Sequence, residues 1–279
     1  MTNSISKIGL GTVQFGIPYG ISNKQGQTEE SEVSLILNYA REFGINILDT
    51  ASAYGTSEQV LGKNDLSGFK IVSKFLLHNS KKSISQQLHD SLTYLKSQSL
   101  YGYMSHRPME IVSNPKLWEE LIQLKTQGFI KKIGFSFNEI HEVEPVLSLG
   151  LIPDIIQVPY NYFDNRFESY MKALNQNGCE IHTRSAFLQG LFFSELNNLN
   201  AFFNDAKPII QELQKYGSSL AGMLLKYCTD KFFIDKVIFG VNTLSQLKNN
   251  IKDISVTNKL PLQKISINES ILIPSQWPK

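Results

Sequence analysis

Short apolar runs alternate with longer segments of helical period along almost the whole chain. The runs are rich in β-branched and aromatic residues, which is typical of buried strands. Eight strands are predicted, at residues 7–11, 45–49, 70–74, 101–105, 131–135, 154–158, 180–184 and 236–240. The segments between them carry apolar residues at steps of three and four, which predicts helices. These helices are expected near residues 29–43, 57–62, 80–97, 114–128, 139–149, 165–177, 204–228 and 243–252.

Strands that alternate with helices favour a parallel sheet. Eight such units in a chain of 279 residues indicate a closed (β/α)8 barrel, with a doubly wound sheet of eight strands as the alternative. We expect residues 1–279 to form a single barrel domain. The seventh unit is long and is expected to carry an extra loop or helix around residues 191–204. The proline-containing segment 255–279 is predicted to be an extended tail laid over the barrel.

The bulk composition narrows the class of protein. A hydrophobic fraction of 42% is enough for a sizeable core, and a net charge of +2 gives no reason to expect nucleic acid or an anionic membrane as a partner. No run approaches the ~20 apolar residues of a membrane span, and the N-terminus lacks the apolar core of a signal peptide. We therefore expect a cytoplasmic protein. The composition does not indicate the oligomeric state of the protein.

Metal and disulfide chemistry is not indicated by the sequence. The two cysteines, Cys179 and Cys228, lie outside any CxxC pair, which favours two buried free thiols over a disulfide. No HExxH, CxxC or carboxylate cluster has the spacing of a metal site, so no metal ligand is predicted.

Four residues with complementary chemistry lie at or just after the ends of three predicted strands. Asp49 ends the second strand and Tyr54 follows it, Lys74 ends the third strand, and His106 follows the fourth. Catalytic groups of a (β/α)8 barrel come from these strand ends and from the loops after them. A phenol has an ordinary pKa of about 10, and a neighbouring ammonium favours its ionised form. Taken singly, Asp49 and Tyr54 could be loop residues, Lys74 a surface lysine and His106 a turn residue. The ordered set predicts a proton donor that Lys74 and Asp49 tune.

These residues resemble the catalytic pattern of the aldo-keto reductase superfamily. The pattern consists of GLGT at residues 9–12, DTASAYG at residues 49–55, Lys74 and His106, and the resemblance extends from about Ile8 to Asn250. It implies a (β/α)8 barrel and an NAD(P)H-dependent interconversion of a carbonyl and an alcohol. In that family the matching tyrosine is the general acid, the lysine and the aspartate tune it, and the histidine orients the substrate. Residues 13–16 and 184–191 look like bacterial members associated with sugar and surface-polysaccharide metabolism.

The resemblance also implies a cofactor site. The implied residues are Gly11, Thr12, Asp49, Ser136, Gln157, Arg184, Ser185, Gly240, Asn242, Thr243, Gln246 and Asn250. In the family, the residues matching Ser136 and Gln157 contact the nicotinamide carboxamide, and Arg184 stands where many members have a stacking tyrosine. Basic residues for the 2′-phosphate are missing from 240–247, and Lys248 is the nearby candidate. NADP(H) is therefore the expected cofactor, with NAD(H) as the alternative.

Loops at the expected mouth of the barrel contribute aromatic and polar side chains. Phe15, Tyr19, Arg107 and Asn161 are the predicted substrate residues, and they suit a small carbonyl compound or a sugar. Two other functions fit the same barrel. One is a non-catalytic NADP(H)-binding regulatory protein, and the other is an isomerase or aldolase that uses Lys74 as a Schiff-base lysine.

Overall fold

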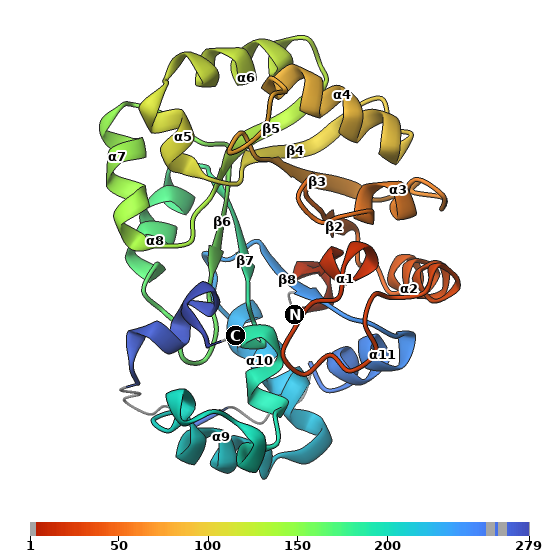
Figure 1. Cartoon of the computed structure of the whole chain (residues 1–279), viewed down its shortest axis with the longest axis vertical. Coiled ribbons are helices and arrows are strands. Elements are labelled where there is room, and N and C mark those ends of the chain that lie inside the picture. The colour runs from red at the N-terminus through yellow and green to blue at the C-terminus, as the bar shows by residue number, and fades with distance from the viewer. Residues whose placement is uncertain (1–3, 255–259, 262–266, 279) are drawn as a thin grey trace.

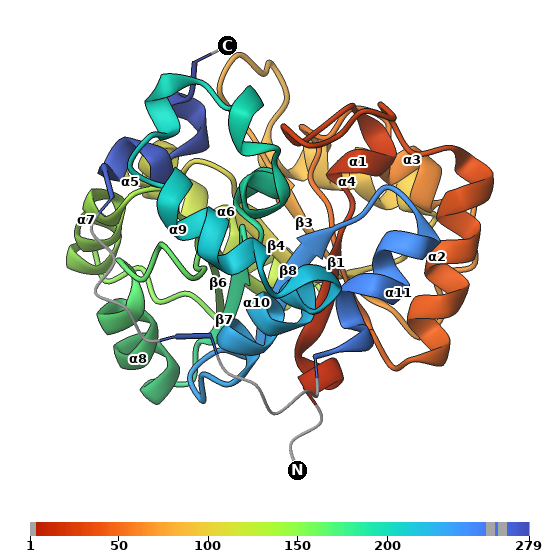
Figure 2. The same cartoon turned by 90° about the horizontal axis from the view of Figure 1, so that it is seen from below.

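The centre of the molecule is a closed barrel of eight parallel strands that follow one another in sequence order (Figures 1 and 2). The computed structural model describes residues 4–254, 260–261 and 267–278. The strands are β1 (Ile8–Gly11), β2 (Ile47–Asp49), β3 (Lys70–Phe75), β4 (Leu100–Ser105), β5 (Ile130–Ser136), β6 (Ile155–Pro159), β7 (Glu180–Arg184) and β8 (Lys236–Gly240). Because β1 pairs with both β2 and β8, the sheet is closed. The barrel prediction is confirmed, and the doubly wound alternative is wrong.

The first strand shows how side chains divide between the two faces of the barrel. Ile8 and Leu10 are buried in the main core, between the barrel and its helices. Gly9 faces the barrel interior, where a Cβ would lie 2.5 Å from Cδ1 of Ile238. The interior is filled by one apolar side chain from each of five strands, namely Ile47, Val72, Met104, Ile155 and Ile238. Ile238 takes the space that a side chain at position 9 would need.

Helices follow the strands and cover the outside of the barrel (Figure 1). They are α2 (Glu30–Glu42), α3 (Ser57–Leu61), α4 (Ile84–Leu95), α6 (Lys116–Thr126), η2 (Ile140–Glu142) with α7 (Val143–Ser148), α8 (Glu168–Gln176), α10 (Leu220–Thr229) and α11 (Leu244–Lys252). The start of α4 is fixed by a capping box, in which Ser83 and Gln86 bond to each other's backbone N–H. The helix ends at Lys96, whose φ of 49° is left-handed. A short 3-10 helix, η1 (Ser4–Lys7), precedes β1.

The prediction of one helix over residues 204–228 is wrong. This region forms two helices, α9 (Lys207–Gln214) and α10, with the 3-10 turn η6 (Gly217–Ser219) between them. Gly217 has a φ of 56°, a left-handed conformation that interrupts a right-handed helix and that glycine adopts at little cost. Two short helices, α1 (Val13–Gly16) and α5 (Pro108–Ser113), were not predicted.

The extra segment predicted after the seventh strand is present as three 3-10 helices, η3 (Leu188–Phe193), η4 (Leu196–Asn198) and η5 (Ala201–Phe203). It packs with α9, α10 and the described part of the tail in a second core cluster. There the rings of Phe203 and Trp277 meet edge to face, with centroids 5.0 Å apart.

The tail differs from the extended chain that we predicted. Residues 255–259, 262–266 and 279 lie outside the described residues, and the described part contains two 3-10 helices, η7 (Glu269–Leu272) and η8 (Pro274–Gln276). It buries Leu260, Ile271 and Trp277 in the second core cluster and so covers the segment after β7.

Three further features bear on function. Both cysteines, Cys179 and Cys228, are buried and free. No helix within the described ranges is both long and apolar enough to cross a membrane. Across the same ranges, no three His, Cys, Asp or Glu side chains gather as the ligands of a metal ion would.

Candidate active site

Lys74 lies at the centre of the candidate site, at the C-terminal end of the barrel. Its side chain is fully buried in β3, and its Nζ donates to Oδ2 of Asp49 at 2.6 Å and to the carbonyl oxygen of Thr50 at 3.0 Å. The same Nζ lies 5.2 Å from the centre of the Tyr54 ring. The rings of Tyr54 and His106 meet edge to face, with centroids 5.9 Å apart. The structure therefore brings the four predicted catalytic residues together.

Two glycines let the loop that carries Tyr54 approach the barrel end closely. A Cβ on Gly16 would lie 1.8 Å from the carbonyl oxygen of Tyr54, and a Cβ on Gly55 would lie 2.6 Å from the carbonyl oxygen of Gly16. Gly55 also has a φ of 58°, which favours glycine. Beneath this contact the buried hydroxyls of Thr12 and Ser57 share a hydrogen bond of 2.8 Å. Close backbone packing thus fixes the position of Tyr54.

Asp49 helps to keep Lys74 charged although its side chain is fully buried. Burial disfavours the ammonium, but the charge of Asp49, the neighbouring Tyr54 and the hydrogen bond to Asp49 together outweigh burial, and the pKa of Lys74 is raised. The other carboxylate oxygen of Asp49, Oδ1, accepts a hydrogen bond from Nε2 of Gln157 at 2.7 Å. The amide oxygen of Gln157 is buried and has no partner among the described residues. Gln157 therefore orients Asp49 and keeps one acceptor unused.

His106 is held in its neutral form. Burial, followed by the positive charges of Lys74, Arg184 and Arg107, lowers the pKa of His106 to about 3. At neutral pH the ring therefore carries one N–H donor and one acceptor nitrogen. Its Nδ1 is buried, and the described part of the chain offers it no partner.

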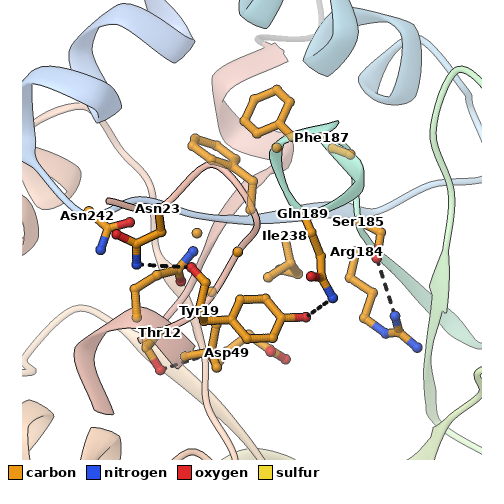
Figure 3. A pocket seen from close by; sticks show the side chains of 18 of the residues that line it. Thr12, Tyr19, Asn23, Asp49, Arg184, Ser185, Phe187, Gln189, Ile238 and Asn242 are labelled. Atoms are coloured by element: carbon orange, nitrogen blue, oxygen red, sulfur yellow. Dashed lines mark hydrogen bonds between the residues drawn. The ribbon is translucent and has the colours of Figure 1, made fainter. Parts of the chain in front are cut away.

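A cavity of about 610 Å³ opens from these residues along the C-terminal end of the barrel (Figure 3). Tyr54 and His106 form part of its wall, and the loops after β1, β7 and β8 form much of the rest. It is lined by the predicted cofactor residues Gly11, Thr12, Asp49, Arg184, Ser185, Gly240, Asn242, Gln246 and Asn250. Ser136, at the end of β5, and Gln157, in the middle of β6, are instead buried. Thr243 caps α11, where its hydroxyl accepts from the backbone N–H of Gln246 at 3.1 Å.

The N-terminus of α11 carries an acidic partner. Oε1 of Glu32 in α2 accepts from the backbone N–H of Leu244 at 2.6 Å. Lys248 places its Nζ 5.1 Å from the centre of the Tyr39 ring and does not line the cavity. A helix N-terminus attracts anions, but the carboxylate of Glu32 already uses this one.

The four predicted substrate residues lie in different environments. Tyr19 lines the cavity, and its hydroxyl accepts from Nε2 of Gln189 at 3.1 Å. Arg107 is exposed and lies off the cavity wall. Phe15 is fully buried in the main core, and Asn161 is fully buried with its side chain bonded to backbone groups of its own turn and of the β7 loop. The prediction of a substrate contact is therefore corrected for Phe15 and Asn161, because packing and turn formation use their side chains.

Loop residues that were not predicted as site residues complete the wall, among them Gln14, Asn23, Asn138, Phe187, Gln189 and Phe193. A Cβ on Gly240 would lie 2.2 Å from Oε1 of Gln14, so glycine at position 240 makes room for that side chain. The amide oxygen of Gln14 is buried and finds no partner in the described ranges. Its place two residues after the GLGT segment was a signal that sequence reasoning could have used.

The residues present fit a nicotinamide dinucleotide. The volume lies within the range of sites for small molecules. Gln14 and His106, which line the cavity, each have a buried polar atom without a partner in the described residues, as does Gln157 behind the wall. Gly11 and Gly240, at the ends of two neighbouring strands, also line the cavity.

The closed barrel gathers an acid, a lysine, a tyrosine and a histidine at the C-terminal ends of its strands, which is where (β/α)8 barrels carry their active sites. A family model described as "Aldo/keto reductase family" matches residues 7–272, and the chain therefore belongs to this family. It is an oxidoreductase that acts on carbonyl or alcohol groups.

Individual relatives with 24–29% sequence identity agree with this assignment. An uncharacterized oxidoreductase, C28F2.05 of Schizosaccharomyces pombe, is 29% identical over 148 residues, which cover 53% of this chain and 49% of that protein. The aldo-keto reductase YhdN of Bacillus subtilis is 24% identical, over 87% of this chain and 83% of its own length. The solved holo form of an aldo-keto reductase from Bacillus halodurans has a TM-score of 0.69 at 20% identity, with 91% of this chain and 88% of that chain covered. This last likeness shows the fold.

Proposed function

We propose that the protein reduces a small polar carbonyl compound or sugar with NAD(P)H, and oxidises the alcohol in reverse, with Tyr54 as the general acid. The observation that carries this proposal is the buried Lys74–Asp49 pair directly beneath the Tyr54 ring. A buried charged lysine beside a phenol at the end of a ligand-sized cavity is an arrangement for proton transfer.

Each of the four side chains has a distinct role in this proposal. The Tyr54 hydroxyl gives its proton to the carbonyl oxygen, and the charge of Lys74 stabilises the phenolate that remains. Asp49 keeps Lys74 charged and fixed. His106, which is neutral, donates one hydrogen bond to the same oxygen and so orients the substrate. The bound cofactor supplies the hydride that goes to the carbonyl carbon.

The proposed cofactor site extends from these residues toward α11. Arg184, Ser185 and Gln14 would lie along the nicotinamide half, and Asn242, Gln246 and Asn250 along the adenine half. We infer that the protein accepts both NADP(H) and NAD(H) with modest discrimination. Glu32 opposes a further negative charge at the start of α11, and Lys248 is the nearby cation. Fluorescence titration with both nucleotides tests this inference.

The geometry argues against Lys74 as a Schiff-base lysine. A Schiff base forms from a neutral amine, whereas the pKa of Lys74 is raised and its ammonium donates to Asp49 and Thr50. Its side chain is also fully buried, beneath Tyr54 rather than on the cavity wall. Borohydride should therefore fail to label Lys74 in the presence of an aldehyde.

The Tyr54→Phe variant tests the proposed function. It removes the proton donor and keeps the ring, so the rate of aldehyde reduction should fall by roughly 10²–10⁴-fold while the Kd of the cofactor stays close to wild type. Tyr19→Phe is the matched control, because it removes another phenolic hydroxyl from the same cavity. In Tyr19→Phe the rate of aldehyde reduction should fall by less than about tenfold. Reduction by Tyr54→Phe at the wild-type rate would sink the proposal, and wild-type protein that binds NADPH without turnover would favour the regulatory alternative.

A further inference from the structure

Arg184 places a positive charge at the catalytic end of the cavity. It ends β7, and its Nη2 donates to the carbonyl oxygen of Phe137 at 3.1 Å and to Oδ1 of Asn138 at 2.5 Å. Its Nη1 lies 3.3 Å from the hydroxyl of Ser185, whose φ of 64° is left-handed. These three bonds hold the guanidinium in one place.

Acidic side chains do not neutralise this charge. Within the described residues Arg184 forms no ion pair, and the partners that it does have are a backbone carbonyl, an amide and a hydroxyl. Asp49 is the carboxylate on the cavity wall, and Lys74 and Gln157 use both of its oxygens. A guanidinium keeps its charge wherever proteins stay folded. The catalytic end of the cavity therefore carries a net positive charge.

The charge lies near the reacting groups rather than at the far end of the cavity. The guanidinium acts electrostatically on His106, Lys74 and Tyr19. Asn242, near the start of α11, lies on the opposite side of the cavity from Arg184 in Figure 3. An anion drawn to Arg184 would thus sit beside the carbonyl that Tyr54 and His106 hold.

The bonds of Arg184 leave donors for a ligand. A guanidinium has five N–H donors. Two on Nη2 and one on Nη1 have the acceptors named above, while the Nε–H and the second Nη1–H have none among the described residues. A purely structural side chain here would need neither the charge nor the two remaining donors, and placing a cation near Lys74 has an electrostatic cost.

We propose that Arg184 selects carbonyl substrates that also carry a carboxylate. This inference rests on the proposed reduction with Tyr54 as acid and names the substrate class of that site. The carboxylate accepts hydrogen bonds from the unused N–H groups of Arg184 and neutralises its charge. The carbonyl of the same molecule then faces Tyr54 and His106.

Two aldehydes that differ in one charge test the proposal. Para-carboxybenzaldehyde and its methyl ester present the same carbonyl on the same ring. The kcat/KM of the wild-type protein should favour the acid over the ester by at least about tenfold, less so at high salt. In Arg184→Gln this ratio should fall to about one, and Arg184→Lys should keep part of it. Lys252→Gln removes an exposed cation at the C-terminal end of α11 and should leave the ratio unchanged.

The outcomes are distinguishable. An equal preference for acid and ester in the wild type overturns the proposal without any variant. If Arg184→Gln lowers kcat/KM equally for the acid and the ester and raises the Kd of NADPH, Arg184 serves the cofactor and the proposal is overturned. If Arg184→Gln does not fold, the acid-to-ester ratio of kcat/KM in the wild type and in Arg184→Lys still tests the proposal. Failure to reduce either compound, or any neutral aldehyde, would contradict the proposed function itself rather than the charge preference.

Discussion

The two ends of the barrel both bury charges, but they arrange them differently. At the N-terminal end of the strands, Glu180 accepts from the hydroxyl of Tyr101 at 2.6 Å, from Nε2 of His182 at 2.7 Å, and from Nζ of Lys132. Burial would raise the pKa of Glu180, but these hydrogen bonds and charges outweigh it and hold the pKa well below its ordinary range. This acid is surrounded by donors from three strands. Within this group of side chains, Nδ1 of His182 is the buried polar atom that lacks a partner among the described residues.

The C-terminal end keeps charges and polar atoms unused. Lys74 and Asp49 neutralise each other, whereas Arg184 forms no ion pair with any described residue. The polar atoms without partners include Nδ1 of His106 and Oε1 of Gln14, and both residues line the cavity. Unsatisfied buried groups lower stability. We infer that the first end serves to hold the barrel together, and that the second end loses some stability because it keeps polar groups for a ligand.

The largest expected effect comes from breaking the Lys74–Asp49 pair. Lys74→Met leaves the Asp49 carboxylate buried and unpaired, so the free energy of unfolding should fall by about 3–5 kcal/mol. The rate of carbonyl reduction should fall by roughly 10²–10⁴-fold, because the charge that stabilises the Tyr54 phenolate is lost. Kinetics on a good aldehyde and urea denaturation measure the two losses.

A double-mutant cycle with Asp49→Asn sharpens this prediction. The amide removes the unpaired charge, so adding Asp49→Asn to Lys74→Met should recover part of the lost stability and should cost little further activity. If the losses in rate and stability are additive, the two residues act independently and the coupled-pair account is wrong.

A smaller effect is expected from the neutral state of His106. Its pKa is about 3 in the folded protein and about 6.5 in the unfolded chain. Between these values the unfolded chain binds a proton that the folded protein does not, so stability is lost as the pH falls below about 6.5. The loss is about 1.4 kcal/mol per pH unit, or about 2 kcal/mol at pH ~5.

His106→Asn should remove this pH dependence. The variant and the wild type can be compared by urea denaturation between about pH 7 and about pH 5. The gap between their free energies of unfolding should shift in favour of the variant as the pH falls, by about 2 kcal/mol. Parallel curves would show that burial and the charges around His106 do not hold it neutral.

Much of the fold could be predicted because strand signals in this chain are local. The eight apolar runs are short, are bounded by polar or glycine residues and alternate with helical periods, so their order alone indicated the barrel. The break between α9 and α10 was missed because both sides continue an apolar helical pattern and the stop depends on the left-handed backbone of Gly217. One glycine within a helical pattern is a weak signal.

The candidate site also has a part that could be predicted from the sequence and a part that could not. Asp49, Tyr54, Lys74 and His106 could be placed because parallel strands bring their C-terminal ends to one face. The β7 loop could not be traced, because it turns through left-handed conformations at Ser185, Leu188 and Gln189, which are not glycines and carry no such signal. Phe15 and Asn161 were predicted to line the mouth because the paths of their own loops could not be traced either. Their burial depends on loop paths that only the folded chain defines.

The most direct test of the account measures both ends of the barrel with the same substitution chemistry. Asp49→Asn and Glu180→Gln each turn a buried acid into its amide, and each variant is assayed for kcat/KM on a good aldehyde and for its free energy of unfolding. We predict that Asp49→Asn lowers kcat/KM by at least about 10²-fold. Glu180→Gln should keep kcat/KM within about threefold of wild type and lose about 2 kcal/mol of stability. A loss of turnover in Glu180→Gln as large as that in Asp49→Asn would contradict the division between a structural end and a catalytic end.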